Sequence, residues 1–367
     1  MVNATGFLFF IFPHMEKRIK ELDVLRVVAM LFVVTYHFGC DYGAREIPFF
    51  NLFCTTPNYD FGNIAVTIFL VLSGGLLYKK YGKLFDGAGS VSLKDFYLKR
   101  ARSIYPPFWI FNLYIVLSMA RHFVSDGSPF YAGNPAKLLL TVFGFDGIAQ
   151  RLGYETYFFC GEWFVGAIVV LYLLFPLLAR IYQKASVVLM LALVVLYGLQ
   201  FLLLGESLSL ICVSPVTWVL KFCLGFVIFD RLDALRNWRL ALGALALLLA
   251  LTFVDVPGIL NEDCLGTVAA LAWFAVVFYC SPWLLKFSAV EWVVAKLAVL
   301  SYCVFLVQHV VISWSQIGFV KIFEKMQWHY SSLATLVLLI VTVGVIVAVA
   351  WILNMLSSKL TGILDRK

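Results

Sequence analysis

Apolar segments of about 18 to 24 residues recur along the whole chain, and each is long enough to cross a hydrocarbon core of about 30 Å as a helix. Composition agrees with this pattern, because 62% of the residues are hydrophobic and only 13% are charged, far from soluble usage. We therefore expect an all-α polytopic membrane protein with about ten transmembrane helices. The expected spans are residues 23–41, 61–80, 104–124, 163–183, 187–205, 213–230, 239–255, 264–283, 296–315 and 333–356.

The positive charges predict how the chain threads the membrane. When residues at the ends of spans are counted with the adjoining connection, the two termini and the even-numbered connections together carry 20 Lys and Arg residues and the odd-numbered connections carry 6. Arg26 and Lys221 lie deeper within spans and complete the 28. Cytoplasmic loops hold the excess of Lys and Arg in membrane proteins, so both termini are expected in the cytoplasm. The net charge of +7 then reflects topology and gives no reason to expect nucleic-acid binding.

One membrane domain with short ends accounts for the whole chain. Residues 1–22 form a cytoplasmic N-terminal segment in which Met15 could be the true start, because the first fifteen residues lack the basic region and cleavage site of a signal peptide. Residues 23–357 form the transmembrane domain, and residues 358–367 form a cytoplasmic tail. The connections are too short for an independent catalytic domain, so any chemistry must take place within the helix bundle or at its faces.

The eight cysteines show no Cys-x-x-Cys pair and no metal-ligand spacing, so neither a metal site nor a redox motif is expected. Some of them could pair in an oxidising compartment, because five fall at or beyond the expected outer helix ends. Unpaired buried thiols are the alternative. The five are Cys40, Cys54, Cys160, Cys212 and Cys264.

The first span carries two ionisable residues, Arg26 and His37, which are eleven positions apart. On a helix they differ by about 20° in azimuth and by about 16 Å along the axis, so they share a face. Ionisable groups in a bilayer point into protein or a wet cavity, which predicts a polar lining here. Asp23 can pair with Arg26 across one turn. The alternatives are a snorkelling anchor for Arg26 and a structural histidine for His37.

A second histidine, His309, is expected at a similar depth, because it lies thirteen residues beyond Lys296 in a helix that also runs from inside to outside. Two imidazoles facing one cavity could act as general base or acid and as an orienting group. A polar core residue is the alternative for His309. Lys221, near the centre of its span, is a further candidate cavity residue, because a buried ammonium needs a partner or water.

Several stretches resemble, in order, the motifs of the acyltransferase type 3 family of integral membrane acyltransferases, and together they cover nearly the whole chain. The first has an Arg-x10-His spacing, which alone is weak evidence, whereas the ordered set on about ten helices is specific. The stretches are ELDVLRVVAMLFVVTYH, NIAVTIFLVLSGGLLYKK, DFYLKRARSIYPPFW, EWFVGAIVVLYLLFPLLAR and SYCVFLVQH.

This resemblance implies an O-acyltransferase, in a stand-alone form without a soluble esterase-like domain. It would transfer an acetyl group from cytoplasmic acetyl-CoA, with no bound cofactor, to a hydroxyl of a cell-envelope glycan or glycolipid precursor. His37 matches the family's essential histidine, and Arg26 its arginine partner. Ser103 replaces an arginine common in the family, and Ile168 stands where some members have glutamate, which leaves Glu162 as a possible substitute carboxylate.

Coenzyme A phosphates need cationic hydrogen-bonding partners, and the basic cluster of one cytoplasmic connection suits them, with Lys99, Arg100 and Arg102 as the donor-binding candidates. Ordinary positive-inside bias is the alternative. Ser73-Gly74-Gly75 removes side-chain bulk from the second span, for which close helix packing is the expected reason and approach of a thin pantetheine arm is the alternative. On the outer side, Glu162, Trp163 and Asn63, with Lys221 in the membrane, are candidate acceptor-binding residues. The alternatives are solvated loop residues for most of the outer polar side chains and an interfacial belt aromatic for Trp163.

The expected location is the inner, or plasma, membrane of the cell as a multi-pass protein in contact with the lipid bilayer. A proton-coupled secondary transporter or flippase for a glycan-related substrate is the alternative function, because buried Arg, Lys and His would also suit a proton path. No inverted repeat is visible in the sequence to support it. The acceptor and the oligomeric state stay open.

Overall fold

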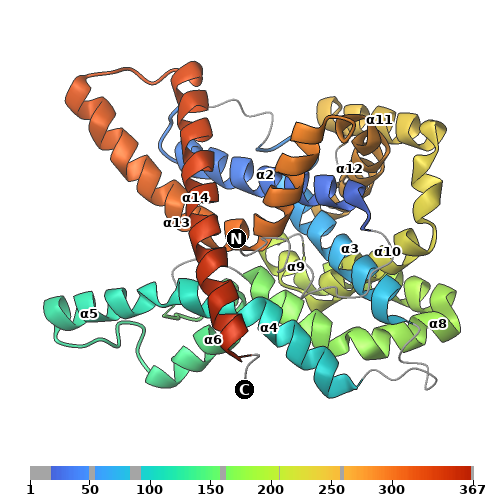
Figure 1. Cartoon of the computed structure of the whole chain (residues 1–367), viewed down its shortest axis with the longest axis horizontal. Helices are drawn as coiled ribbons and strands as arrows, with labels where there is room; N and C mark the ends of the chain where they lie inside the picture. Colours follow the sequence, from blue (N-terminus) through green and yellow to red (C-terminus); the bar gives the residue numbers. More distant parts are fainter. Residues whose placement is uncertain are drawn as a thin grey trace. The chain divides into compact units, whose positions relative to one another are not determined.

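The computed structural model describes residues 18–48, 54–82, 92–157, 163–205, 207–256 and 260–364, and all regular structure within these ranges is helical (Figure 1). The helices are α2 (Lys20–Gly43), α3 (Phe61–Tyr81), α4 (Leu93–Asn112), α5 (Tyr114–Asp126), α6 (Leu138–Phe143), α7 (Asp146–Arg151), α8 (Trp163–Leu204), α9 (Leu208–Cys212), α10 (Pro215–Asp230), α11 (Trp238–Phe253), α12 (Glu262–Leu284), α13 (Ser288–Met326) and α14 (Ser332–Leu364), with short 3-10 helices η3 (Pro135–Lys137) and η4 (Leu232–Arg236). The all-α prediction is confirmed for these residues.

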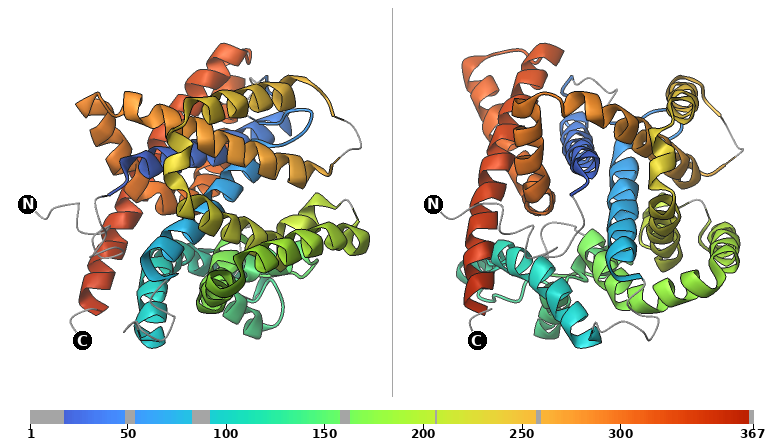
Figure 2. Two further views of the ribbon diagram at one scale, coloured as in Figure 1. Left: turned by 90° about the vertical axis from the view of Figure 1, so that its right-hand side faces the viewer. Right: turned by 45° about the vertical axis from the view of Figure 1, so that its right-hand side comes forward.

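Seven helical stretches in the described ranges are long and apolar enough to cross a membrane. Each of the ten expected spans coincides largely with helix, but α8 contains two of them, on either side of the non-helical Ala185, where its ribbon bends (Figure 2). Two others correspond to α10 and α11, which have 16 residues each. At 1.5 Å per residue these reach about 24 Å, less than a hydrocarbon core. The count of ten and the cytoplasmic termini stay predictions.

The chain packs into two compact units. Among the described residues, unit 1 contains Ser73–Val227 and the end of the chain from Leu353, and unit 2 contains the part of His14–Leu72 that the structure describes and Ile228–Ile352. The predicted single domain of residues 23–357 is therefore built from two packed groups of helices, each described by itself below.

In unit 2, α2 and α13 run parallel. Lys20 Nζ lies 2.5 Å from Glu291 Oε1 at their beginnings, and Ser313 Oγ donates to Asp41 Oδ2 at 3.3 Å near the end of α2. In both pairs the partner on α13 lies about 272 positions further along the chain, so the two helices stay in register. Their common direction agrees with the expectation that both run from inside to outside.

A small-residue step brings α3 against α10 in unit 1. A Cβ on Gly74 would overlap the carbonyl oxygen of Phe222 and would lie 2.9 Å from its carbonyl carbon. On the next turn of α3, Tyr78 stacks on Phe226 with ring centroids 4.8 Å apart. The close packing expected of the Ser73-Gly74-Gly75 step is therefore present, since only hydrogen fits at Gly74.

The connection between α5 and α8, also in unit 1, has its own small core. Tyr157 is fully buried with Ile115 and Ala132, and its hydroxyl donates to the carbonyl of Gly133 at 2.5 Å. Asp146, at the start of α7, is 1% exposed and accepts a hydrogen bond from Thr141 at 3.1 Å. Burial raises the pKa of Asp146 to about 6. The connection between α5 and α8 thus holds a buried carboxyl group.

Replacing Gly74 by alanine should destabilise the protein, because the new methyl group would meet backbone of α10 that a side-chain rotation cannot move away. Thermal unfolding of the detergent-solubilised protein measures this. The matched control is Gly198→Ala in α8, where nothing lies within 4 Å of the added Cβ. Equal melting temperatures for the two variants would contradict the packing assigned to Gly74.

Replacing Asp146 by asparagine should stabilise the protein more at pH 7 than at pH 4. The folded protein keeps the proton of Asp146 up to about pH 6, whereas the unfolded chain loses it near the ordinary pKa of 3.8. Stability therefore falls as the pH rises between these values and stays lower above them. Asparagine can still accept from Thr141 but cannot ionise. Melting curves at both pH values test this, and a pH-independent difference would argue against it.

Candidate active site

The two histidines expected at matching depth lie against each other in unit 2. The ring centroids of His37 on α2 and His309 on α13 are 3.9 Å apart, with an interplanar angle of 54°. Both side chains are half-buried. The parallel register of α2 and α13 explains the contact, because His37 and His309 again differ by 272 positions. One imidazole can thus exchange a proton while the other lies within contact distance to orient it or to stabilise its charge.

The beginning of α3 packs against α2 beside this histidine pair. A Cβ on Gly62 would lie 2.6 Å from the ring of Tyr36, the residue before His37, so only glycine permits this approach. The Tyr36 and His37 rings are 5.1 Å apart in an edge-on arrangement. Asp60 caps the start of α3 by accepting from the backbone N–H of Asn63 at 2.6 Å. The segment that carries these polar groups is therefore held next to His37.

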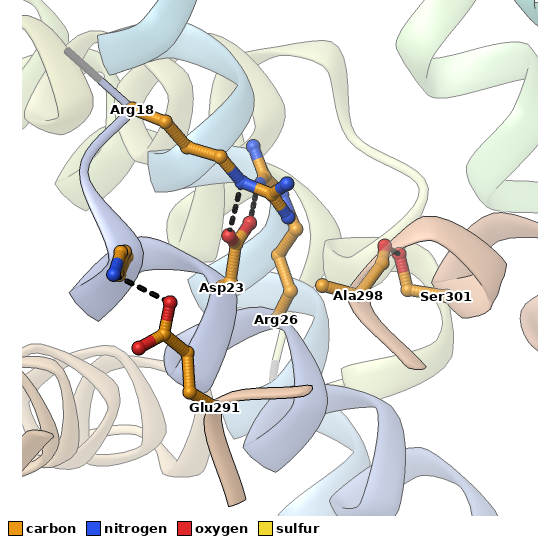
Figure 3. A network of polar contacts seen from close by, with 7 residues as sticks. Arg18, Asp23, Arg26, Glu291, Ala298 and Ser301 are labelled. Carbon is orange, nitrogen blue, oxygen red and sulfur yellow. Dashed lines mark hydrogen bonds and ion pairs between the residues drawn. The ribbon is translucent and has the colours of Figure 1, made fainter. Parts of the chain in front are cut away.

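Arg26 takes part in an ionic network at the start of α2, away from the histidines. Its Nη1 lies 2.6 Å from Asp23 Oδ1, and Arg18 Nε lies 2.6 Å from Asp23 Oδ2, so one carboxylate binds two guanidinium groups (Figure 3). Arg236 Nη2 pairs with Glu21 at 2.8 Å. The expected Asp23–Arg26 pair is present, but Arg26 is separated from His37 by about 16 Å of helix.

Asn63 connects α3 to α12. Its Nδ2 donates to Asp263 Oδ1 at 3.0 Å, and its Oδ1 accepts from Thr67 at 3.3 Å. Asp263 is fully buried, and Asn63 is 8% exposed. A Cβ on Gly266 would lie 2.7 Å from Asn63 Nδ2, which brings the two helices close. The Asn63 amide thus holds α3 and α12 together, and its acceptor-binding role stays a prediction.

In unit 1, the structure distinguishes Arg100 from its basic neighbours. Arg100 is 5% exposed, whereas Lys99 and Arg102 are exposed. The guanidinium lies over the rings of Tyr172 and Tyr81, at 5.8 and 6.0 Å from their centroids. Within the described ranges, no hydrogen-bond acceptor reaches Arg100 Nε or Nη2, and the buried hydroxyl of Tyr81 has no partner either. Cation–π contact alone leaves strong donors unsatisfied, which favours binding of an anion from outside the chain.

Trp163, the first residue of α8, is part of a stack in unit 1. Its ring lies 6.1 Å from that of Trp218 at 17°, and the Arg151 guanidinium lies 5.8 Å from its centroid. Trp218 is buried and donates from its indole to the carbonyl of Cys212 at 2.6 Å. Trp163 is therefore held by protein contacts, and the acceptor-binding role predicted for it would use the half-exposed remainder of the ring.

Lys221 is 3% exposed near the middle of α10, where the sequence predicted it. One turn before it, the hydroxyl of Thr217 accepts from Gln200 Nε2 at 3.0 Å, and Ser214 donates to Gln200 Oε1 at 2.6 Å. This buried polar cluster joins α8 to α10. Glu162, the possible substitute carboxylate, lies outside the described residues, as does Cys160.

Two features of the site were not anticipated from the sequence. Gln308, directly before His309, is fully buried, and neither polar atom of its amide has a hydrogen-bond partner within the described ranges. An amide inside an otherwise apolar span was the available signal. Tyr172, which faces Arg100 and whose hydroxyl lies 3.1 Å from Ser73 Oγ, stands in the quoted stretch EWFVGAIVVLYLLFPLLAR, but no sequence pattern predicted its contact with Arg100.

Among the described side chains, no group of three or more His, Cys, Asp or Glu residues is arranged to hold a metal ion. The arrangement offers paired imidazoles in unit 2 and an unsatisfied buried cation in unit 1. These suit proton transfer and anion binding, respectively.

Comparison with known proteins gives one informative match. Residues 19–355 match the family model described as an acyltransferase domain. No curated protein and no solved structure matches the chain. The matched region contains both histidines and the basic cluster, and it spans nearly the whole sequence. With its membrane-length helices, the chain is a multi-pass membrane acyltransferase and belongs to the acyltransferase type 3 family.

Proposed function

We propose that the protein is a membrane O-acetyltransferase that moves an acetyl group from cytoplasmic acetyl-CoA to a hydroxyl of a cell-envelope glycan or glycolipid precursor. The contact between His37 and His309, with ring centroids 3.9 Å apart on two parallel membrane helices, is the observation that carries the proposal. Family membership supports acyl transfer and does not favour the transporter or flippase hypothesis.

In the proposed mechanism, His37 acts as the general base. A ring nitrogen takes the proton of the acceptor hydroxyl, and the oxygen attacks the thioester carbonyl carbon to form a C–O bond. The C–S bond then breaks, and the coenzyme A sulfur leaves with the proton returned from His37. The role of His309 is to orient the ring of His37 and to stabilise its transient positive charge. An acetyl-imidazole intermediate on His37 is the alternative route, and acid-quenched mass spectrometry of the enzyme with acetyl-CoA would detect it.

Arg100 is the proposed ligand for a phosphate of the donor. The support is its burial, the absence of acceptors for Nε and Nη2 within the described ranges, and the tyrosine rings that hold its plane. A guanidinium forms paired, charge-assisted hydrogen bonds with phosphate oxygens. Lys99 and Arg102 are exposed and would contribute long-range attraction to the anionic donor.

Arg26 is proposed as a positioning residue. The Asp23 carboxylate holds it together with Arg18, and the neighbouring Lys20–Glu291 pair fixes the same end of α2 to α13. Any shift between these two helices would separate the histidine rings. For the acceptor, the proposed ligands stay those expected from the sequence, which are Asn63, Trp163, Lys221 and Glu162.

Replacing His37 by alanine should abolish acetyl transfer, with a loss of about 100-fold or more, because a general base contributes at least that much. We would measure O-acetyl groups on surface glycans by mass spectrometry in a deletion strain that carries wild type or variant at equal abundance. The matched control is His329→Ala, which removes an exposed histidine. Equal O-acetylation with His37→Ala and wild type would rule out the proposed catalytic role.

Replacing Arg100 by glutamine should raise the KM for acetyl-CoA about tenfold or more, because a charge-assisted hydrogen bond contributes about 1.5–3 kcal/mol. Arg102→Gln should have a much smaller effect, since its side chain is exposed. Steady-state release of coenzyme A by the purified protein gives both values. A KM for Arg100→Gln equal to that of Arg102→Gln would show that the buried guanidinium does not bind the donor.

A further inference from the structure

Two cysteines meet at the end of α2. The sulfur atoms of Cys40 and Cys54 are 4.0 Å apart, and Cys54 Sγ also lies 3.7 Å from the carbonyl oxygen of Tyr36. Cys40 is exposed, whereas Cys54 is 5% exposed. No disulfide joins the seven cysteines of the described ranges. Of the five expected near the outer face, these two are in contact with each other.

We propose that Cys40 and Cys54 form a disulfide in the mature protein, which ties the turn before α3 to α2 one turn beyond His37. A disulfide needs its sulfur atoms at about 2.05 Å. The two sulfur atoms are 4.0 Å apart, so the bond requires them to approach by about 2 Å. The proposal rests on the orientation that puts this end of α2 outside the cytoplasm, and it is independent of the transferred group.

Exposure sets the order of the reaction. The exposed Cys40 thiolate attacks the disulfide of an extracytoplasmic thiol oxidant and forms a mixed disulfide with release of one oxidant thiol. Cys54 then attacks Cys40 Sγ, and the second oxidant thiol leaves. The two cysteines lose two electrons and two protons in total, and the oxidant disulfide gains them as two thiols.

The state of Cys54 agrees with this order. Its hydrogen bond with Cys40, together with burial, raises the pKa of the Cys54 thiol above its ordinary value. Cys54 therefore stays protonated while Cys40 is a thiol. Once Cys40 is in the mixed disulfide, the hydrogen bond from Cys40, which is the larger cause of the raised pKa, is lost. The Cys54 thiol then loses its proton more readily and becomes more reactive than before.

The turn that would be tied is already ordered by backbone hydrogen bonds. Phe61 N donates to the carbonyl of Cys54 at 3.1 Å, and Thr56 N donates to Tyr59 at 2.8 Å. The turn ends at Asp60, which caps α3 through Asn63. A bond from Cys54 to α2 would therefore fix the start of α3 next to His37, and it would close a loop of about 15 residues that reduces the freedom of the unfolded chain.

Peptide mapping without reductant tests the proposal. Cells are treated with N-ethylmaleimide before lysis to block free thiols, and the full chain is then purified and digested. We expect a linked peptide that contains Cys40 and Cys54 and disappears on reduction or in Cys54→Ser. The control Cys264→Ser should leave it unchanged. Alkylation of both Cys40 and Cys54 in the wild-type protein would overturn the proposal.

A second measurement uses the wild-type protein itself, so that it does not depend on a cysteine variant that folds poorly. Reduction of the wild type with dithiothreitol should lower its melting temperature, whereas the Cys40→Ser/Cys54→Ser double variant should melt at the reduced wild-type temperature and be insensitive to reductant. Insensitivity of the wild type would also overturn the proposal. A link that forms only after the purified protein is treated with oxidised glutathione would confirm the contact but reject the disulfide in the cell.

Discussion

A polar or charged side chain within a bilayer must be held by other protein groups, because hydrocarbon offers no hydrogen-bond partner. In unit 2 the parallel pairing of α2 with α13 meets this requirement for the two histidines, and polar contacts flank them at both ends of the interface. Lys20 binds Glu291 at the beginning, the two histidines meet further along, and Asp41 accepts from Ser313 beyond them. The constant register between the helices makes these contacts interdependent, so the imidazole pair is positioned by the whole interface.

A charged group buried by protein has a similar requirement, and this explains why Arg100 stands out in unit 1. The chain surrounds its guanidinium with aromatic rings but leaves donors unsatisfied within the described ranges. Each buried donor that is left without a hydrogen bond costs about 1–3 kcal/mol, and more when the donor is charged. An anionic ligand that satisfies them would recover that free energy on binding. An acyl donor with several phosphates is such an anion. Ordinary positive-inside bias, by contrast, does not require a buried guanidinium.

The geometry of individual helices accounts for the features that the sequence predicted. Tertiary contacts decide the features that the sequence left open. Helical rise and spacing were enough to expect the Asp23–Arg26 pair and similar depths for His37 and His309, because both depend on one helix or on two helices of known direction. By contrast, Lys99, Arg100 and Arg102 form one basic stretch, and only packing against Tyr81 and Tyr172 selects the middle residue for burial. Asn63 meets Asp263 across 200 positions, a pairing that no local pattern contains. The expected spans 163–183 and 187–205 both belong to α8, where the non-helical Ala185 separates them. The sequence has no strong helix breaker at that position to predict the kink.

The position of Arg26 shows how one helix can serve two separate tasks at a fixed spacing. Its guanidinium is held by Asp23, and eleven residues of helix separate it from His37. Direct contact with a group bound at His37 would require it to leave that carboxylate, which would then face Arg18 alone. We propose instead that the Arg-x10-His spacing keeps a fixed distance between the ion pair at the start of the helix and the imidazole that the helix carries.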